Sequence, residues 1–136
     1  MAPRGYRQTA LVPPDLEQSG LPDSWFTTMS DTDSLRQLTH RLEAFAAERH
    51  WQPFHSPKNL ASALSVEAAE LLEHFQWLTE DQSRQLPADK KEEVAFEMAD
   101  VLLYLVQLSS ALEVDLLDAA RRKMVVNARK YPVGGP

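Results

Sequence analysis

The sequence predicts an all-α protein, a bundle of about four helices. Three observations point that way. Apolar residues recur at three- and four-residue spacing in four stretches, only four glycines occur in 136 residues, and runs of β-branched residues are few. At this length the chain forms at most one ordinary domain, and its 43% apolar and 25% charged residues are typical of globular proteins.

The ordered part of the chain is expected to span residues 31–132. Its first helix should run from about residue 33 to residue 50, because several N-capping residues precede an apolar stripe. The second should begin with Ser56 as N-cap and Pro57 at the first helical position. The apolar stripe that follows predicts that this helix continues to about residue 78.

A polar connection over residues 79–87 should lead to the third helix, which is predicted over residues 88–112. The fourth helix should run from Asp115 to about Lys130, with Asp115 as a capping residue. Prolines and glycines interrupt residues 1–30, so we expect a disordered N-terminal tail there. Residues 133–136 should form a short C-terminal tail.

The third predicted helix indicates that the chain associates with copies of itself. Residues 101–106 place apolar side chains on every side of this helix. A helix that is apolar all round has to be covered on all sides, and three short neighbours offer too little surface for this. We therefore expect a homo-oligomer.

Four carboxylates are the most informative feature of the sequence. They form two pairs of equal spacing, Glu67-x-x-Glu70 in the second predicted helix and Glu97-x-x-Asp100 in the third. Residues three apart share a helix face, about 4.5 Å apart along the axis. Small and apolar neighbours surround both pairs, so their burial is unfavourable without a compensating charge. If the two helices pack side by side, the four acids converge on a site that suits a hard divalent cation, above all Mg2+.

Charge and composition exclude several classes of function. The net charge is −6; residues 56–104 carry ten acidic and four basic residues, whereas residues 116–136 carry one acidic and five basic residues. No broad basic stripe results, so we expect no nucleic-acid partner. The absence of cysteine excludes thiolate metal sites. Because no apolar run approaches the ~20 residues that cross a bilayer, and residues 1–30 lack a secretory core, we expect no membrane partner and a cytoplasmic location.

A di-iron helical bundle is the nearest rival to a Mg2+ site. Such bundles need Glu-x-x-His pairs. His74 instead lies four residues after Glu70 and seven after Glu67, and no Glu-x-x-His occurs on the third predicted helix. Redox iron is therefore not expected.

Four blocks of sequence carry a family resemblance. They are Trp51-x-x-Phe54-His55-x-Pro57-x-Asn59-Leu60, Glu67-Ala-Ala-Glu70-Leu71 with Phe75-Gln76-Trp77, Glu97-Met-Ala-Asp100-Val-Leu-Leu-Tyr104-Leu, and Lys123-Met-x-x-Asn127-x-Arg129-Lys130-Tyr131-Pro132. In this order, over residues 35–132, they resemble the MazG-type all-α nucleoside triphosphate pyrophosphohydrolases, nearest to the dCTP pyrophosphatase branch. One position departs, because Leu42 stands where the family has a histidine.

The resemblance implies an enzyme that hydrolyses a (deoxy)nucleoside triphosphate to the monophosphate and pyrophosphate, with dCTP or a modified dCTP as its substrate. It also implies Mg2+ as cofactor, assembly as a dimer or tetramer, and a role in sanitation of the nucleotide pool. By match to the family motif, the implied metal ligands are Glu67, Glu70, Glu97 and Asp100. The implied phosphate or sugar contacts are Lys123, Asn127, Arg129, Lys130 and Tyr131. The implied base-binding residues are Trp51, His55, Trp77 and Tyr104.

Elementary chemistry agrees with this interpretation. Cleavage of a triphosphate depends mostly on charge neutralisation and positioning. One of the carboxylates, for which we choose Glu70 before Glu67, is expected to take the proton of the attacking water. Lys123 and Arg129 would hold the leaving pyrophosphate. Two alternatives stay open: a non-enzymatic helical regulatory or adaptor oligomer, and a pyrophosphohydrolase for dUTP or phosphoribosyl-ATP.

Overall fold

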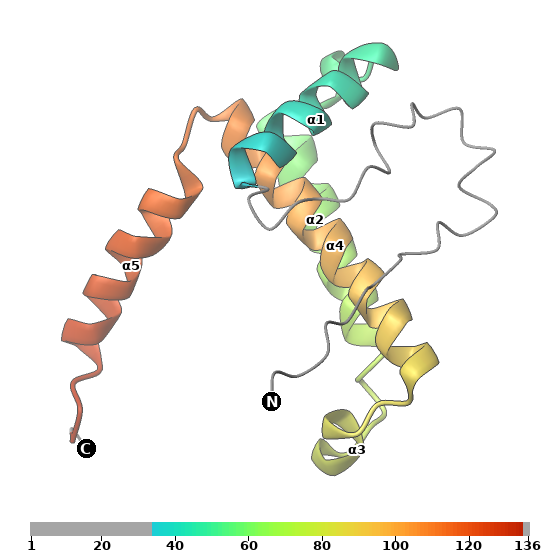
Figure 1. Ribbon diagram of the computed structural model, residues 1–136, viewed down its shortest axis with the longest axis vertical. Coiled ribbons are helices and arrows are strands. Elements are labelled where there is room, and N and C mark those ends of the chain that lie inside the picture. Colours follow the sequence, from blue (N-terminus) through green and yellow to red (C-terminus); the bar gives the residue numbers. More distant parts are fainter. Residues whose placement is uncertain (1–33, 135–136) are drawn as a thin grey trace, which may run out of the picture. The chain divides into compact units, whose positions relative to one another are not determined.

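The computed structural model describes residues 34–134, and this range is helical with no β-strand (Figure 1). The all-α prediction is thereby confirmed. The predicted N-terminal tail, residues 1–30, lies outside the described residues. The elements are α1 (Leu35–Glu48), the 3-10 helix η2 (Gln52–Phe54), α2 (Pro57–Glu73), α3 (Glu80–Arg84), α4 (Ala88–Ala111) and α5 (Leu116–Lys130).

Two boundaries differ from the prediction. Helix α2 ends at Glu73 rather than near residue 78, and the chain then turns, with the amides of Phe75 and Gln76 both donating to the carbonyl of Leu72 at 2.9 Å. The predicted polar connection contains the short helix α3. A capping box starts α3, in which the Thr79 hydroxyl accepts from the Gln82 amide and the Gln82 side chain accepts from the Thr79 amide. Five residues are too few to show helical periodicity, although the Thr-x-x-Gln pattern is a recognisable start signal.

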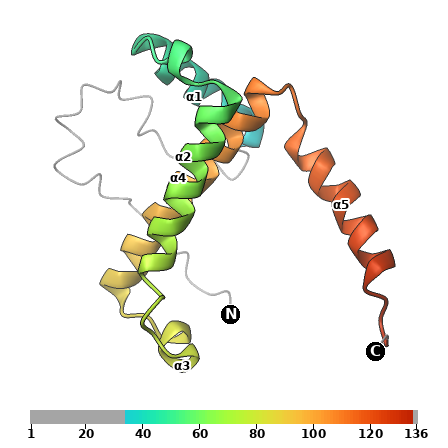
Figure 2. The same ribbon diagram turned by 180° about the vertical axis from the view of Figure 1, so that it is seen from behind.

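Helices α2 and α4 lie side by side and antiparallel, as two opposite views agree, and they form the main packing unit (Figure 1, Figure 2). Helix α1 packs against α4. The buried apolar core is small and comes from these three helices: Leu42 and Ala46 of α1, Leu60 of α2, and Val94 and Val106 of α4. This packing brings the two acidic motifs of the sequence to neighbouring helices.

Local capping fixes the ends of the helices as the sequence predicts. The Ser56 side chain accepts from the Asn59 amide at 3.2 Å, and Pro57 occupies the first turn of α2. The Asn59 side chain donates to the carbonyl of Phe54 at 2.9 Å, which ties the preceding loop to α2. At α5, the Asp115 carboxylate accepts from the Asp118 amide at 2.9 Å. Each such cap contributes about 1 kcal/mol to helix stability.

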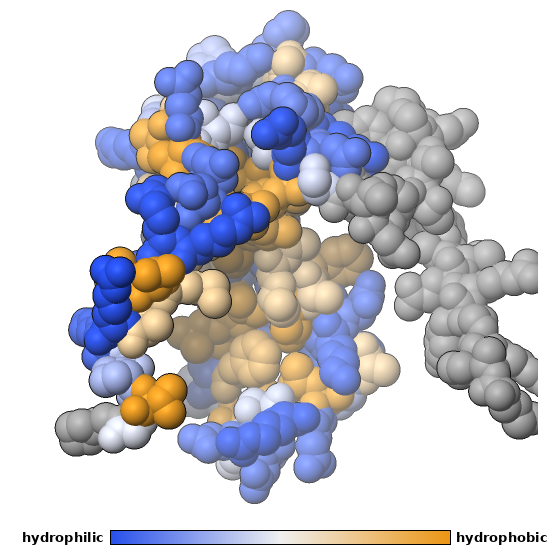
Figure 3. Space-filling model, turned by 60° about the vertical axis from the view of Figure 1, so that its left-hand side comes forward, coloured by the Kyte–Doolittle hydropathy of each residue, from blue (hydrophilic) through white to orange (hydrophobic). Residues whose placement is uncertain are grey.

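Much apolar surface of α4 and α5 is left uncovered within the described residues. Figure 3 shows apolar (orange) side chains open on one face of the molecule. Helix α5 has no buried residue. By length and composition alone α4 also qualifies as a membrane span, and only 11% of its most apolar stretch is buried among the described residues. Core helices of globular proteins, which are mostly buried, meet the same criterion. The exposed apolar residues of these helices include Phe96, Met98 and Leu102 of α4 and Leu117, Met124, Val125 and Val126 of α5.

Candidate metal centre

Three of the predicted carboxylates meet between α2 and α4. Glu67, Glu70 and Glu97 each offer one carboxylate oxygen, and these three oxygens lie within 4.8 Å of one another. The i, i+3 spacing puts Glu67 and Glu70 on the face of α2 that faces α4, and antiparallel packing brings Glu97 opposite them. Glu70 is exposed, whereas Glu67 and Glu97 are half-buried. Three of the four carboxylates that the sequence predicts to converge therefore do so in the fold.

The negative charge of the fourth carboxylate, Asp100, affects the carboxyl group of Glu67. The pKa of Glu67 is raised above its ordinary value of 4.5, first by burial, then by a hydrogen bond between the carboxyl groups of Glu67 and Glu70, and then by the negative charges of Glu70, Asp100 and Glu97. All these causes disfavour the ionised form of Glu67. Acids that lie this close together suit a divalent cation with oxygen ligands.

A histidine adjoins this acidic cluster. The Nε2 atom of His74 lies 3.7 Å from Glu97 Oε1, and its Nδ1 atom lies 3.8 Å from Glu93 Oε2. Glu93 in turn accepts a hydrogen bond from the Lys90 ammonium at 2.6 Å, which raises the pKa of Lys90. The sequence pattern predicts no role for His74 in the site, beyond excluding it as an iron ligand. Its position seven residues after Glu67, on the same helix face, was the signal that could have placed it beside the cluster.

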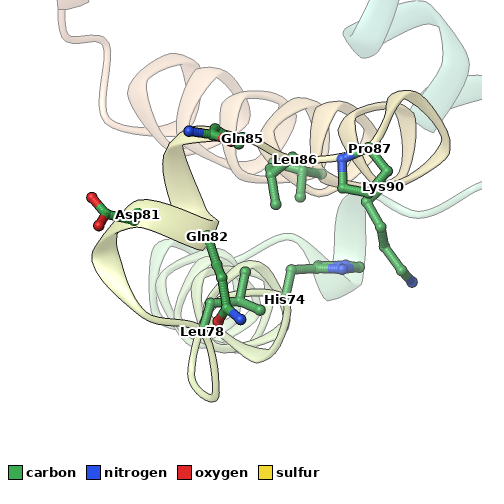
Figure 4. A pocket seen from close by; sticks show the side chains of 9 residues that line it. His74, Leu78, Asp81, Gln82, Gln85, Leu86, Pro87 and Lys90 are labelled. Atoms are coloured by element: carbon green, nitrogen blue, oxygen red, sulfur yellow. The ribbon is translucent and has the colours of Figure 1, made fainter.

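A cavity of about 550 Å3 opens beside His74, between the end of α2, α3 and the start of α4 (Figure 4). In Figure 4 the side chains of His74 and Lys90 extend on the same side of the cavity, and Asp81 points away from them. The wall is mostly apolar, with Leu78, Leu86 and Val94 contributing to it. The cavity and the acidic cluster share the His74 side chain as a boundary.

The four predicted base-binding residues do not all come together in one chain. Trp51 and His55 precede α2, with ring centroids 6.1 Å apart, and Trp51 also packs edge-on against Phe45 at 5.6 Å. Trp77 follows α2, a helix of 17 residues or about 25 Å. The Trp77 side chain is 87% exposed, against 44% for Trp51. Tyr104 lies on α4, one turn beyond Asp100, and is half-buried.

The predicted phosphate contacts are likewise separate from the acidic cluster. They lie in the second half of α5 and at Tyr131, and all five side chains are exposed. Within residues 34–134, their one side-chain interaction is that of the Lys130 ammonium with the Tyr131 ring, 5.3 Å from the ring centroid. The five residues are Lys123, Asn127, Arg129, Lys130 and Tyr131.

The fold and the acidic cluster assign the chain to a class of proteins. These are all-α proteins with a candidate divalent-cation site between two antiparallel helices. The MazG-like family model matches residues 62–135, which include all four acids of the two motifs. The chain belongs to the MazG-like family.

Similar proteins agree with this assignment. The chain is 46% identical over 107 residues to dCTP pyrophosphatase 1 of Homo sapiens, covering 77% of this chain and 63% of that protein. It is 39% identical over 108 residues to dCTP pyrophosphatase 1 of Bos taurus, covering 78% and 64% respectively. The chain therefore spans somewhat less than two thirds of these relatives. A crystal structure of a pyrophosphatase from Archaeoglobus fulgidus is similar in fold, with a TM-score of 0.69 at 43% identity, over 72% of this chain and 92% of that one.

Proposed function

We propose that the chain is a Mg2+-dependent nucleotide pyrophosphohydrolase that cleaves a (deoxy)nucleoside triphosphate, dCTP or a modified dCTP first, to the monophosphate and pyrophosphate. One observation carries the proposal: three carboxylate oxygens lie within 4.8 Å of one another in a chain that is 46% identical to a dCTP pyrophosphatase. A role in sanitation of the nucleotide pool and a cytoplasmic location belong to the same proposal.

The residues present fit a magnesium ion. All four candidate ligands are carboxylates, the donor type that Mg2+ prefers, and the pKa of Glu67 is raised by burial first, then by its hydrogen bond with Glu70 and by the negative charges of its acidic neighbours. Glu67, Glu70, Glu97 and Asp100 would hold the ion. When bound, Mg2+ neutralises phosphate charge and lowers the pKa of a bound water.

The protein's own side chains supply the remaining steps. Glu70 is the exposed member of the cluster, so its carboxylate is the group we assign to take a proton from the attacking water. Lys123 and Arg129 would bind the leaving pyrophosphate, the guanidinium through forked hydrogen bonds. Trp51, His55, Trp77 and Tyr104 are assigned to the base.

A homo-oligomer, dimer or tetramer, completes the proposal. In the described chain the cations of α5 and the acids of α2 and α4 form no ion pair with one another. The apolar side chains of α4 and α5 are also exposed, Met124 to 70%. Association of copies would cover this surface, and it would bring the α5 cations and the separated aromatic residues to a common site.

Incubation with a panel of triphosphates tests the proposed reaction. The panel contains dCTP, 5-methyl-dCTP, dUTP, dTTP, dATP and phosphoribosyl-ATP, each with Mg2+ or with EDTA. We expect Mg2+-dependent release of pyrophosphate, fastest with a cytosine nucleotide, and loss of this activity in Glu97→Gln.

The same panel separates the alternatives. Orthophosphate in place of pyrophosphate would contradict cleavage between the α and β phosphates. Faster turnover of dUTP or phosphoribosyl-ATP would reassign the substrate. No turnover of any nucleotide, by an oligomer that is folded, would favour a non-enzymatic regulatory or adaptor protein.

A further inference from the structure

A histidine at the end of α2 faces one turn of α4. The backbone of His74 caps α2, because its amide donates to the carbonyl of Leu72. The imidazole Nε2 atom lies 3.7 Å from Glu97 Oε1, and Nδ1 lies 3.8 Å from Glu93 Oε2. These two acids are four residues apart and therefore share a face of α4. With only 20% of its side chain exposed, His74 is held between the two carboxylates.

The two carboxylates differ in their other partners. The Lys90 side chain extends on the same side of the cavity as His74 (Figure 4), and its ammonium donates to Glu93 Oε2 at 2.6 Å. Glu97 has no such partner: among residues 34–134, His74 is the one basic side chain within 4 Å of its carboxylate. The partners of an imidazole decide which of its nitrogens carries the proton. Because an ammonium already satisfies Glu93, the N–H of His74 is left for Glu97.

Glu97 needs a partner of this kind if it is to hold a cation. Its side chain is 25% exposed, and the other members of the cluster are acids, which repel its carboxylate. A donor to one carboxylate oxygen fixes the side chain and leaves the second oxygen for the ion. The distance of 3.7 Å is longer than a hydrogen bond, and contacts in a site without its ligand often shorten when the ligand binds.

We propose that His74 is a positioning residue, whose Nε2–H donates to Glu97 Oε1 and orients that carboxylate toward the divalent cation. Lys90 supports it by occupying Glu93, which would otherwise compete for the imidazole N–H. The inference rests on the proposed function and adds how one of the metal ligands is held in place. Removal of a group that orients a metal ligand lowers metal affinity by roughly ten- to a hundredfold.

Three substitutions of His74 test the inference through Mn2+ binding to the nucleotide-free protein, followed by electron paramagnetic resonance. The amide nitrogen of a glutamine can take the place of Nε2, whereas that of an asparagine can take only the place of Nδ1. We expect the Kd for Mn2+ to rise roughly ten- to a hundredfold in His74→Leu and His74→Asn, and to stay within about threefold of wild type in His74→Gln. The control is His40→Leu, at a side chain of α1 that is 71% exposed, and it should leave Kd unchanged.

Three results would overturn the inference. The first is an unchanged Kd in His74→Leu. The second is tighter binding in His74→Leu, which is the result for a histidine that only repels the cation by its charge. The third is an equal loss in His74→Gln and His74→Asn, because a role through Nε2 requires the glutamine to retain affinity.

Turnover distinguishes positioning from a general structural role. In His74→Leu the Mg2+ concentration for half-maximal rate should rise by the same factor as the Kd for Mn2+, while kcat at saturating Mg2+ stays within about threefold of wild type. A fall in kcat that no Mg2+ concentration restores, together with a lower Tm, would assign His74 to the fold and not to Glu97.

Mn2+ binding also separates this inference from the proposed function. Glu97→Gln serves as the reference, because it removes a proposed metal ligand. A wild type that binds Mn2+ no more tightly than Glu97→Gln would refute the metal site and the role of His74 together. A wild type that binds Mn2+ and releases pyrophosphate, with the same Kd in His74→Leu, would refute the role of His74 alone.

Discussion

Removing one negative charge from the acidic cluster should stabilise the metal-free protein. Glu70→Gln keeps the size of the side chain and a group that can hydrogen-bond Glu67, but it abolishes repulsion with Glu67 and Glu97, whose oxygens lie within 4.8 Å. At this separation each pair of charges contributes about 1 kcal/mol in a water-like dielectric, and salt reduces it. We therefore expect a gain of about 1–2 kcal/mol at low ionic strength, or an increase in Tm of roughly 4–8 °C per kcal/mol for a domain of this size.

Thermal unfolding followed by circular dichroism, in EDTA and in Mg2+, measures this effect. Mg2+ should raise the Tm of wild type by mass action, and should raise that of Glu70→Gln much less. Glu92→Gln is the matched control, because it removes one negative charge from an exposed acid of α4 that lies outside the cluster. A Tm for metal-free Glu70→Gln that is equal to or below those of wild type and Glu92→Gln would refute the idea of a repulsive, cation-seeking cluster.

Further variants test the raised pKa of Glu67, a predicted phosphate contact, the homo-oligomer and the cap of α3. The raised pKa of Glu67 means that its protonated form stabilises the fold; this contribution is full below pH 4.5 and is lost as pH rises through the raised pKa. In EDTA, the Tm of Glu67→Gln should thus equal the Tm of wild type below pH 4.5 and exceed it by a growing margin as the pH rises. A Tm difference that does not change with pH would contradict the raised pKa of Glu67. Arg129→Ala should raise KM for the triphosphate about tenfold or more while the helical content is kept, and unchanged kinetics would place this guanidinium away from the phosphates. Met124→Glu should shift the mass measured by light scattering toward the monomer. A wild type that is already monomeric at micromolar concentration would contradict the proposed homo-oligomer. Thr79→Ala should cost about 1 kcal/mol through loss of the α3 cap, measured by urea unfolding, with Ser83→Ala as the control within the same short helix.

Sequence patterns were sufficient for the long helices and for the acidic cluster. Period and capping residues predicted α1, α4 and α5 to within a few residues, because each carries an apolar stripe and a recognisable start. The i, i+3 spacing places each pair of acids on one helix face, and the two pairs were expected to converge on the condition that the two helices pack side by side. Glu67, Glu70 and Glu97 therefore meet as expected.

Features that depend on tertiary geometry could not be predicted in the same way. Helix α2 ends at Glu73, where the backbone turns, although the apolar pattern continues to Leu78. The predicted boundary was wrong because an apolar pattern indicates which side chains face the core and does not indicate where the backbone turns. Whether His74 faces Glu97 depends on the rotation of each helix by a few tens of degrees. The grouping of Trp51 with Trp77 came from a family pattern, and such a pattern holds no information on which residues belong to one copy of the chain.

In the proposed function, the acids of α2 and α4 bind a divalent cation that engages a triphosphate. A crystal structure of the protein with Mn2+ in place of Mg2+ and a non-hydrolysable dCTP analogue tests it most directly, because Mn2+ is located by its anomalous scattering. We expect an anomalous peak about 2.0–2.3 Å from carboxylate oxygens of Glu67, Glu70 and Glu97, with phosphate oxygens completing the coordination. A bound analogue without metal at these residues, or metal bound only elsewhere, would rule out a cation site between α2 and α4.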